Sequence, residues 1–118
     1  MDTTTLLADV ERRCREAELP LKATATNLVF GKGNPYASIF FIGESPGRNE
    51  DLQGMPFVGA AGKNLDKLLA GVGLSLDQVY VANVLKYRPP ENRNHSSEEI
   101  RTNATWLAAQ LRTIRPKV

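Results

Sequence analysis

The sequence predicts an α/β fold with parallel strands, and this prediction depends on two apolar runs and the helix between them. Residues 38–43 form a short run that is apolar on both faces, as is typical of a strand buried in a parallel sheet. A second apolar run covers residues 79–84, and leucines at helical spacing lie between the two. A strand–helix–strand crossover of this length is expected to be right-handed and to join parallel strands.

The first helix is expected over residues 3–18, where apolar side chains recur close to the helical period. Thr4 or Thr5 is the expected N-cap, and Pro20 stops the helix. Residues 27–30 are expected to form a short edge strand or an extended segment before a glycine-rich turn.

A polar loop is expected at residues 49–55, and a second helix from Gly59 until just before Gly73. Ser96 or Ser97 is expected to cap a last helix near the C-terminus. Leu65, Leu68, Leu69 and Val72 are expected to lie on one face of the second helix.

Composition limits the class of protein. A chain of 118 residues, 42% hydrophobic and 24% charged, is expected to form one globular domain over residues 1–118. No apolar run approaches the roughly 20 residues that span a bilayer, and the N-terminus does not resemble a signal peptide, so we expect a cytoplasmic location. The net charge of +2 permits binding to nucleic acid without requiring it.

The one cysteine, Cys14, cannot form an internal disulfide or a thiolate metal cage alone, and we expect an inert thiol.

The carboxyl ends of the two predicted strands are where a ligand site is expected, because parallel strands open a crevice there. Glu44 follows the first strand, where its carboxylate either orients a water or accepts backbone N–H bonds. Asn83 ends the second strand, and a buried amide needs a partner, either backbone or ligand. Lys86 and Arg88 come next, as contacts to phosphate or as ordinary surface charge.

Four segments together resemble one family, the Fe–S type (family 4) uracil-DNA glycosylases. They are GESPG at residues 43–47, the acidic pair Glu50-Asp51, GMPFVG at 54–59 and ANVLKYRPP at 82–90, and the likeness extends over roughly residues 27–118. It implies a three-layer Rossmann-like parallel sheet of the uracil-DNA glycosylase type. It also implies a partner, uracil-containing DNA, with single-stranded DNA as one candidate form, and hydrolysis of the N-glycosidic bond of a flipped uracil in base-excision repair.

The resemblance also implies roles for individual residues. Glu44 and Ser45 would hold the attacking water as catalytic residues. Phe57 would stack on the base, although a lone Phe in an apolar run is more often a core residue. The Asn83 amide would bond the O4 and N3–H edge of uracil. The substrate-binding set is Gly43, Pro46, Gly47, Phe57 and Asn83, and the nucleic-acid contacts are Lys86 and Arg88.

The chain departs from this family at the four cysteines that hold the cluster. Cys14 remains, but the other positions carry Ala17, Tyr87 and Asn103. A [4Fe–4S] cluster requires four thiolates, so we expect no cluster, no other cofactor and no metal site.

Two functions stay open from the sequence. The first is a uracil-DNA glycosylase whose sheet is incomplete at the C-terminus and which is inactive alone, because the family's later His-containing motif would lie beyond Val118. His95 does not match that motif and is expected to be a loop residue. The second is a non-catalytic nucleic-acid-binding module of a larger DNA-processing protein. An open edge is expected on the strand at residues 79–84, so the chain would be a homodimer or part of a longer protein.

Overall fold

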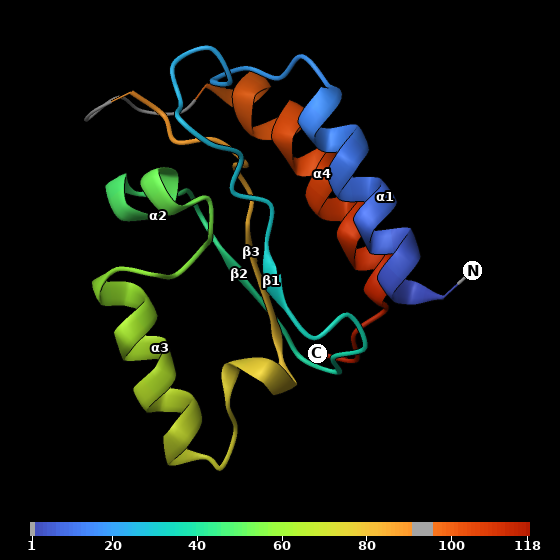
Figure 1. The fold of residues 1–118 in the computed structure, drawn as a ribbon, viewed down its shortest axis with the longest axis vertical. Coiled ribbons are helices and arrows are strands. Elements are labelled where there is room, and N and C mark those ends of the chain that lie inside the picture. The colour runs from blue at the N-terminus through green and yellow to red at the C-terminus, as the bar shows by residue number, and fades with distance from the viewer. Residues whose placement is uncertain (1, 91–95) are drawn as a thin grey trace.

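The computed structural model describes residues 2–90 and 96–118, and it confirms the α/β class (Figure 1). His95, expected in a loop, lies outside the described residues. The elements in chain order are α1 (Thr3–Glu16), β1 (Lys32–Gly33), β2 (Phe40–Gly43), α2 (Arg48–Gln53), α3 (Ala60–Gly71), the 3₁₀ turn η1 (Leu76–Gln78), β3 (Tyr80–Asn83) and α4 (Ser97–Ile114).

The three described strands form one mixed sheet in the order β1-β3-β2. Strands β2 and β3 are parallel as predicted, and their register sets Phe40 opposite Tyr80 and Gly43 opposite Asn83. The all-parallel expectation is wrong for β1, which pairs antiparallel with β3 through Lys32 opposite Val81. The open edge expected on residues 79–84 is also wrong, because β3 is the central strand.

Side chains that bond backbone N–H groups explain two further differences from prediction. Asp2 caps α1 by accepting a hydrogen bond from the Thr5 backbone, so neither predicted threonine is the cap. The expected loop at residues 49–55 is helical over α2, where Glu50 closes a capping box and Asp51 accepts bonds from a distant segment. Acidic residues in a first helical turn are favoured by the helix dipole. At α4 the prediction is confirmed, because Ser96 is the N-cap.

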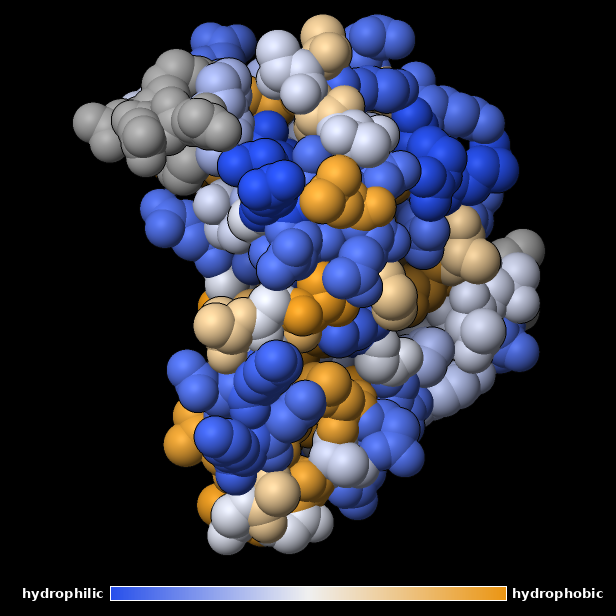
Figure 2. Space-filling view, turned by 60° about the vertical axis from the view of Figure 1, so that its left-hand side comes forward, coloured by the Kyte–Doolittle hydropathy of each residue, from blue (hydrophilic) through white to orange (hydrophobic). Residues whose placement is uncertain are grey.

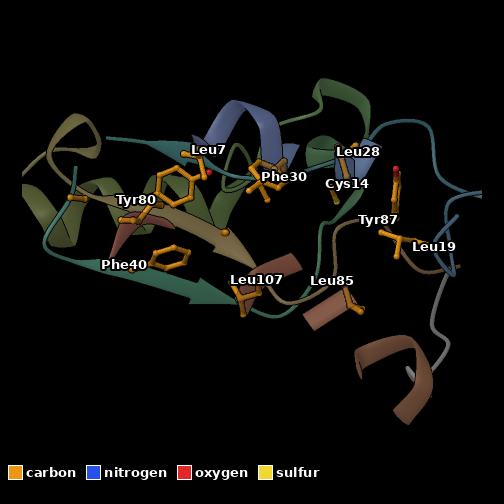
Figure 3. Packing of buried hydrophobic residues seen from close by; sticks show 14 of the residues in the cluster. Leu7, Cys14, Leu19, Leu28, Phe30, Phe40, Tyr80, Leu85, Tyr87 and Leu107 are labelled. Carbon is orange, nitrogen blue, oxygen red and sulfur yellow. The ribbon is translucent and has the colours of Figure 1, made fainter. Parts of the chain in front are cut away.

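The main core lies between the sheet and the pair of helices α1 and α4, which run side by side (Figure 1). Figure 3 shows Phe40 and Tyr80 from the sheet packed with Leu7 of α1 and Leu107 of α4. The Phe40 and Tyr80 rings are 5.2 Å apart in a tilted arrangement, which aromatic pairs favour. The helices α1 and α4 therefore support the sheet that contains β3, and Asn83 is the last residue of that strand.

A smaller cluster lies on the α3 side of the sheet. Leu69 of α3 is buried there with Val79 and Val81. The rest of the apolar face of α3 is not covered, because Leu68 and Val72 are 70% and 72% exposed. The expected burial of the first strand on both faces is wrong, because Ile42 on β2 is 52% exposed, so this side of the sheet is covered only in part. Figure 2 shows hydrophobic surface in the lower half of the molecule, at the height of α3.

Among the helices in the described part of the chain, none combines the length and the apolar character that crossing a bilayer requires.

Candidate functional site

A pocket of about 70 Å³ opens at the carboxyl ends of β2 and β3. It brings together three of the sequence-predicted residues, Ser45, Phe57 and Asn83, and adds Glu50 and Ala61. A larger hollow of about 520 Å³ lies between α1 and α4 and contains none of the predicted site residues. We place the candidate site in the smaller pocket, because it holds a buried amide that needs a partner.

Asn83 is the last residue of β3, and its side chain is only 4% exposed. Within residues 2–90 and 96–118, no protein group bonds its side-chain amide. Leaving such a group buried and unsatisfied costs about 1–3 kcal/mol. The backbone alternative is thus not seen among the described residues, and a ligand as the partner of this amide stays a prediction.

Gly43 makes room for this amide. A Cβ atom at position 43 would overlap Oδ1 of Asn83 and would lie 2.8 Å from Cζ of Phe57. The Asn83 amide and the Phe57 ring thus meet over the α-carbon of Gly43, where an added Cβ atom would force one of the two side chains to shift.

Phe57 is held in an unfavourable backbone conformation. Its φ of 55° is in the left-handed region, which non-glycine residues avoid. The first turn of α3 presses against it, because a Cβ at Gly62 would overlap the Phe57 carbonyl. Lys32 Nζ donates a hydrogen bond to the same carbonyl at 3.4 Å. Backbone strain of this kind costs about 1–3 kcal/mol and is concentrated at functional sites.

Glu50 ties the two loops of the pocket together. Its carboxylate accepts hydrogen bonds from the backbone N–H groups of Gly47 (3.0 Å), Val58 (3.1 Å) and Gly59 (2.8 Å). Partial burial raises the pKa of Glu50, but the backbone N–H groups together outweigh burial and leave the pKa below its ordinary value. A carboxylate that accepts three such bonds is stabilised in its charged form.

The neighbouring Asp51 anchors this part of the chain to the segment before β1. Its Oδ1 accepts bonds from the Thr26 and Asn27 backbones, and the Asn27 side chain donates to the Asp51 carbonyl at 2.8 Å. Lys32 on β1 lies closer to the pocket. Burial lowers the pKa of Lys32, against the attraction of Asp66 and Glu50.

The other residues of the 43–47 turn surround the pocket without lining it. Glu44 is exposed and its backbone carbonyl accepts a hydrogen bond from Leu85. Pro46 is buried, and Gly47 is the N-cap of α2. Of the two residues predicted to hold water, the structure therefore places Ser45 in the pocket lining and Glu44 beside it.

The expectation that Lys86 contacts phosphate is corrected. Its side chain is fully buried, and its Nζ bonds Asn83, Phe30 and Gln110 inside the protein. Burial also lowers the pKa of Lys86 to about 7. Arg88, two residues later, is partly exposed and stays a predicted contact to nucleic acid.

The residues present do not fit a four-cysteine cluster. Tyr87 is buried in the main core, and Asn103 uses both ends of its amide, accepting from the Lys86 backbone at 2.9 Å and donating to the Glu99 carbonyl at 3.0 Å. Cys14 is fully buried, and burial raises the pKa of its thiol to about 11, which disfavours the thiolate. In the described part of the chain, no three His, Cys, Asp or Glu side chains gather as metal ligands.

Ala61 and Lys32 were not predicted as site residues. The small residues at the start of α3 did indicate a close approach of backbone, and the structure shows that the approach is to Phe57. Lys32 gives no sequence signal, because its place beside the pocket depends on the antiparallel pairing of β1.

Comparison with known proteins identifies similarity to the uracil-DNA glycosylases. The family model described as the uracil DNA glycosylase superfamily matches residues 30–118. A type-4 uracil-DNA glycosylase of Archaeoglobus fulgidus is 52% identical over 105 residues, which cover 89% of this chain and 52% of the relative. A second, of Saccharolobus solfataricus, is 44% identical over 119 residues, covering 100% of this chain and 54% of the relative.

A different kind of relative is a protein named DNA polymerase in Bacillus phage SP01. It is 34% identical over 89 residues, which cover 75% of this chain but only 10% of the polymerase. The chain thus spans about half the length of the curated glycosylases and a small part of the polymerase.

Proposed function

This chain belongs to the uracil-DNA glycosylase superfamily, and from that premise we propose that its pocket binds a uracil base extruded from DNA. The observation that carries the proposal is the convergence of the Phe57 ring and the unpartnered Asn83 amide over Gly43. An aromatic face stacks on a flipped base, and an amide offers a donor and an acceptor to its edge.

The proposed reaction is hydrolysis of the N-glycosidic bond. The bond breaks through an oxocarbenium-like state, and the base leaves with the bonding electrons. The oxygen of a water molecule adds to the sugar carbon, and the water releases one proton, which balances the negative charge of the departing base. Glu44 and Ser45 would orient that water from the turn after β2, and Arg88 would contact a phosphate. The proximity of Ser45 to the pocket supports this arrangement.

The finer fold assignment belongs to the same proposal. We infer a three-layer, Rossmann-like sheet of the uracil-DNA glycosylase type. Two observations support it: the parallel pair β2–β3, and hydrophobic clusters that include helix residues on both sides of the sheet.

A binding comparison tests base recognition directly. The chain would be titrated with a single-stranded oligonucleotide that contains one uracil and with the same oligonucleotide carrying thymine. We expect preference for uracil, and Asn83→Ala is expected to abolish it. Asn64→Ala, an exposed amide on α3, is the matched control and should keep the preference. Equal binding of both oligonucleotides by the unaltered chain would contradict the proposal.

A non-catalytic DNA-binding module is the second candidate. The similar segment within a phage protein named DNA polymerase favours it, because there the segment is a tenth of a longer protein. An excision assay on the uracil oligonucleotide tests for catalysis by this chain. Release of uracil that Asn83→Ala abolishes supports the enzyme and excludes the module. Uracil preference without release is the outcome expected both of the module and of a glycosylase that is inactive as this chain alone.

A further inference from the structure

A buried ammonium group is hydrogen-bonded to the backbone of the pocket residue Asn83. Lys86 Nζ donates to the carbonyl oxygens of Asn83 at 2.8 Å and Phe30 at 3.2 Å, and to Oε1 of Gln110 at 2.6 Å. An ammonium has three N–H donors, so these acceptors match all of them. The ring of Phe30 lies 5.6 Å from the nitrogen and adds a cation–π contact.

The two backbone carbonyls accept from the same nitrogen just beyond the residues that pair β1 with β3. Strand β1 pairs Lys32 with Val81, and continuing this antiparallel register by two residues sets Phe30 opposite Asn83. Because β1 begins only at Lys32, no strand pairing is assigned at Phe30. The Lys86 ammonium therefore bridges the two backbones at the end of β3.

Helix α4 anchors this bridge through two fully buried amides. Gln110 accepts from Lys86 and donates to the Phe30 carbonyl at 2.9 Å and to the Tyr80 hydroxyl at 3.2 Å. Asn103 accepts from the Lys86 backbone N–H at 2.9 Å. The end of β3 is thus held on the helix side by a satisfied polar network, and on the other side by β2.

We propose that Lys86 is a positioning residue for Asn83, whose carbonyl it holds so that the side-chain amide stays over Gly43 and faces the pocket. The proposal rests on the proposed function, because it gives the amide a base to bind. A role in the stability of the core alone does not explain why a charged lysine is buried at position 86. Hydrophobic residues that replace buried charged groups are often neutral or stabilising, and methionine has similar length.

The protonation state of Lys86 provides a readout that a purely structural role would not share. Burial brings the pKa of Lys86 to about 7, against the opposing influence of Cys14 on α1. Tyr80 takes part in the network through its hydroxyl, which bonds Gln110, and burial together with the carboxylate of Glu11 on α1 raises the pKa of both Tyr80 and Cys14. The α4 residues Asn103 and Gln110 contribute neutral amides. As pH rises through about 7, the nitrogen loses one donor and one of its three acceptors loses its bond.

Nuclear magnetic resonance of the ¹⁵N-labelled chain tests the contact without any ligand. The side-chain amide signals of Asn83, assigned by their loss in Asn83→Ser, are expected to move with a midpoint near pH 7. In Lys86→Met they should not move over that range. The Asn27 amide, which donates to the carbonyls of Asp51 and Leu52, is the internal control. Identical titration of the Asn83 signals with and without Lys86 would overturn the proposal.

Binding of the uracil and thymine oligonucleotides tests the consequence. Lys86→Met is expected to lose about tenfold in uracil preference, the loss that one charge-assisted hydrogen bond predicts. Lys86→Arg, which retains a charge, should keep most of it at every pH, and the surface variant Lys63→Met should keep all of it.

Melting curves confirm that each variant is folded. A folded Lys86→Met variant with unchanged preference would refute positioning while leaving uracil recognition intact. If the unaltered chain shows no preference, the proposed function fails, and the resonance experiment still decides whether Lys86 holds Asn83.

Discussion

The side-chain oxygen of Asn83 lies against the α-carbon of Gly43, its register partner on the neighbouring strand. Parallel pairing of β2 with β3 puts the two residues side by side at the carboxyl edge of the sheet. The absence of a side chain at position 43 leaves space for the amide and for the edge of Phe57. The glycine at the end of β2 therefore leaves room for two side chains that line the candidate pocket, Asn83 and Phe57, without lining it itself.

Gly43→Ala is expected to block this pocket. The new methyl group would overlap Oδ1 of Asn83 and lie 2.8 Å from the Phe57 ring, so one of the two side chains must move. We expect at least a tenfold loss of uracil preference in the oligonucleotide titration. Gly71→Ala is the control, because a Cβ there meets no atom within 4 Å, and its preference should be unchanged. Unaltered binding by Gly43→Ala would show that the pocket is not where uracil binds.

The sequence was sufficient to predict the elements that depend on local pattern. The strands β2 and β3, the helices α1, α3 and α4, and the cap at Ser96 follow from apolar periodicity and capping residues. The parallel orientation of the two strands then follows from the crossover rule, and the structure adds their register. It brings Asn83 beside Gly43, which is why the predicted residues Ser45, Phe57 and Asn83 share one pocket.

Contacts between distant segments account for what sequence did not predict. The helix α2 depends on side chains that bond other segments: Glu50 reaches Val58 and Gly59, and Asp51 reaches Thr26. Lys86 follows a strand in a segment that ends in prolines, which is typical of a surface turn, yet acceptors from three segments bury it. A pattern of neighbouring residues in the sequence cannot predict the contacts of Glu50, Asp51 or Lys86, because their partners are distant along the chain.

Glu50→Gln is expected to loosen the pocket loops and to lower the free energy of unfolding by about 1 kcal/mol, since the carboxylate is partly exposed. The folded-state pKa of Glu50 is below its ordinary value, so its contribution is present at neutral pH and is lost as pH falls through that lowered pKa. Urea unfolding should show a difference between the two proteins that shrinks on acidification below about pH 4.5. Glu18→Gln, at an exposed position, should show no such trend.

Phe57 allows backbone strain and ring contacts to be separated. Phe57→Ala and Phe57→Gly both remove the ring, but only glycine adopts the positive φ without strain. We expect the glycine variant to be more stable than the alanine variant by about 1 kcal/mol in urea unfolding, while both lose uracil preference. Equal stabilities would mean that the loop relaxes away from this φ when the ring is absent.

The buried Lys86 is expected to affect stability and binding in opposite directions as pH rises. Its folded-state pKa of about 7 lies below the ordinary value of 10.5, so above pH 7 the unfolded chain binds more protons than the folded one. The free energy of unfolding should therefore rise with pH, with a slope of up to about 1.4 kcal/mol per pH unit from this group, while uracil preference falls. Urea unfolding between pH 7 and 8.5 should show the rise in Lys63→Met but not in Lys86→Met. The raised pKa of Cys14 has the opposite effect on stability as its thiol begins to ionise in the unfolded chain, but both variants contain Cys14, so it does not account for a difference between them. Parallel curves for the two variants would show that Lys86 keeps its proton throughout this range, and the pH dependence expected of Asn83 would then be lost as well.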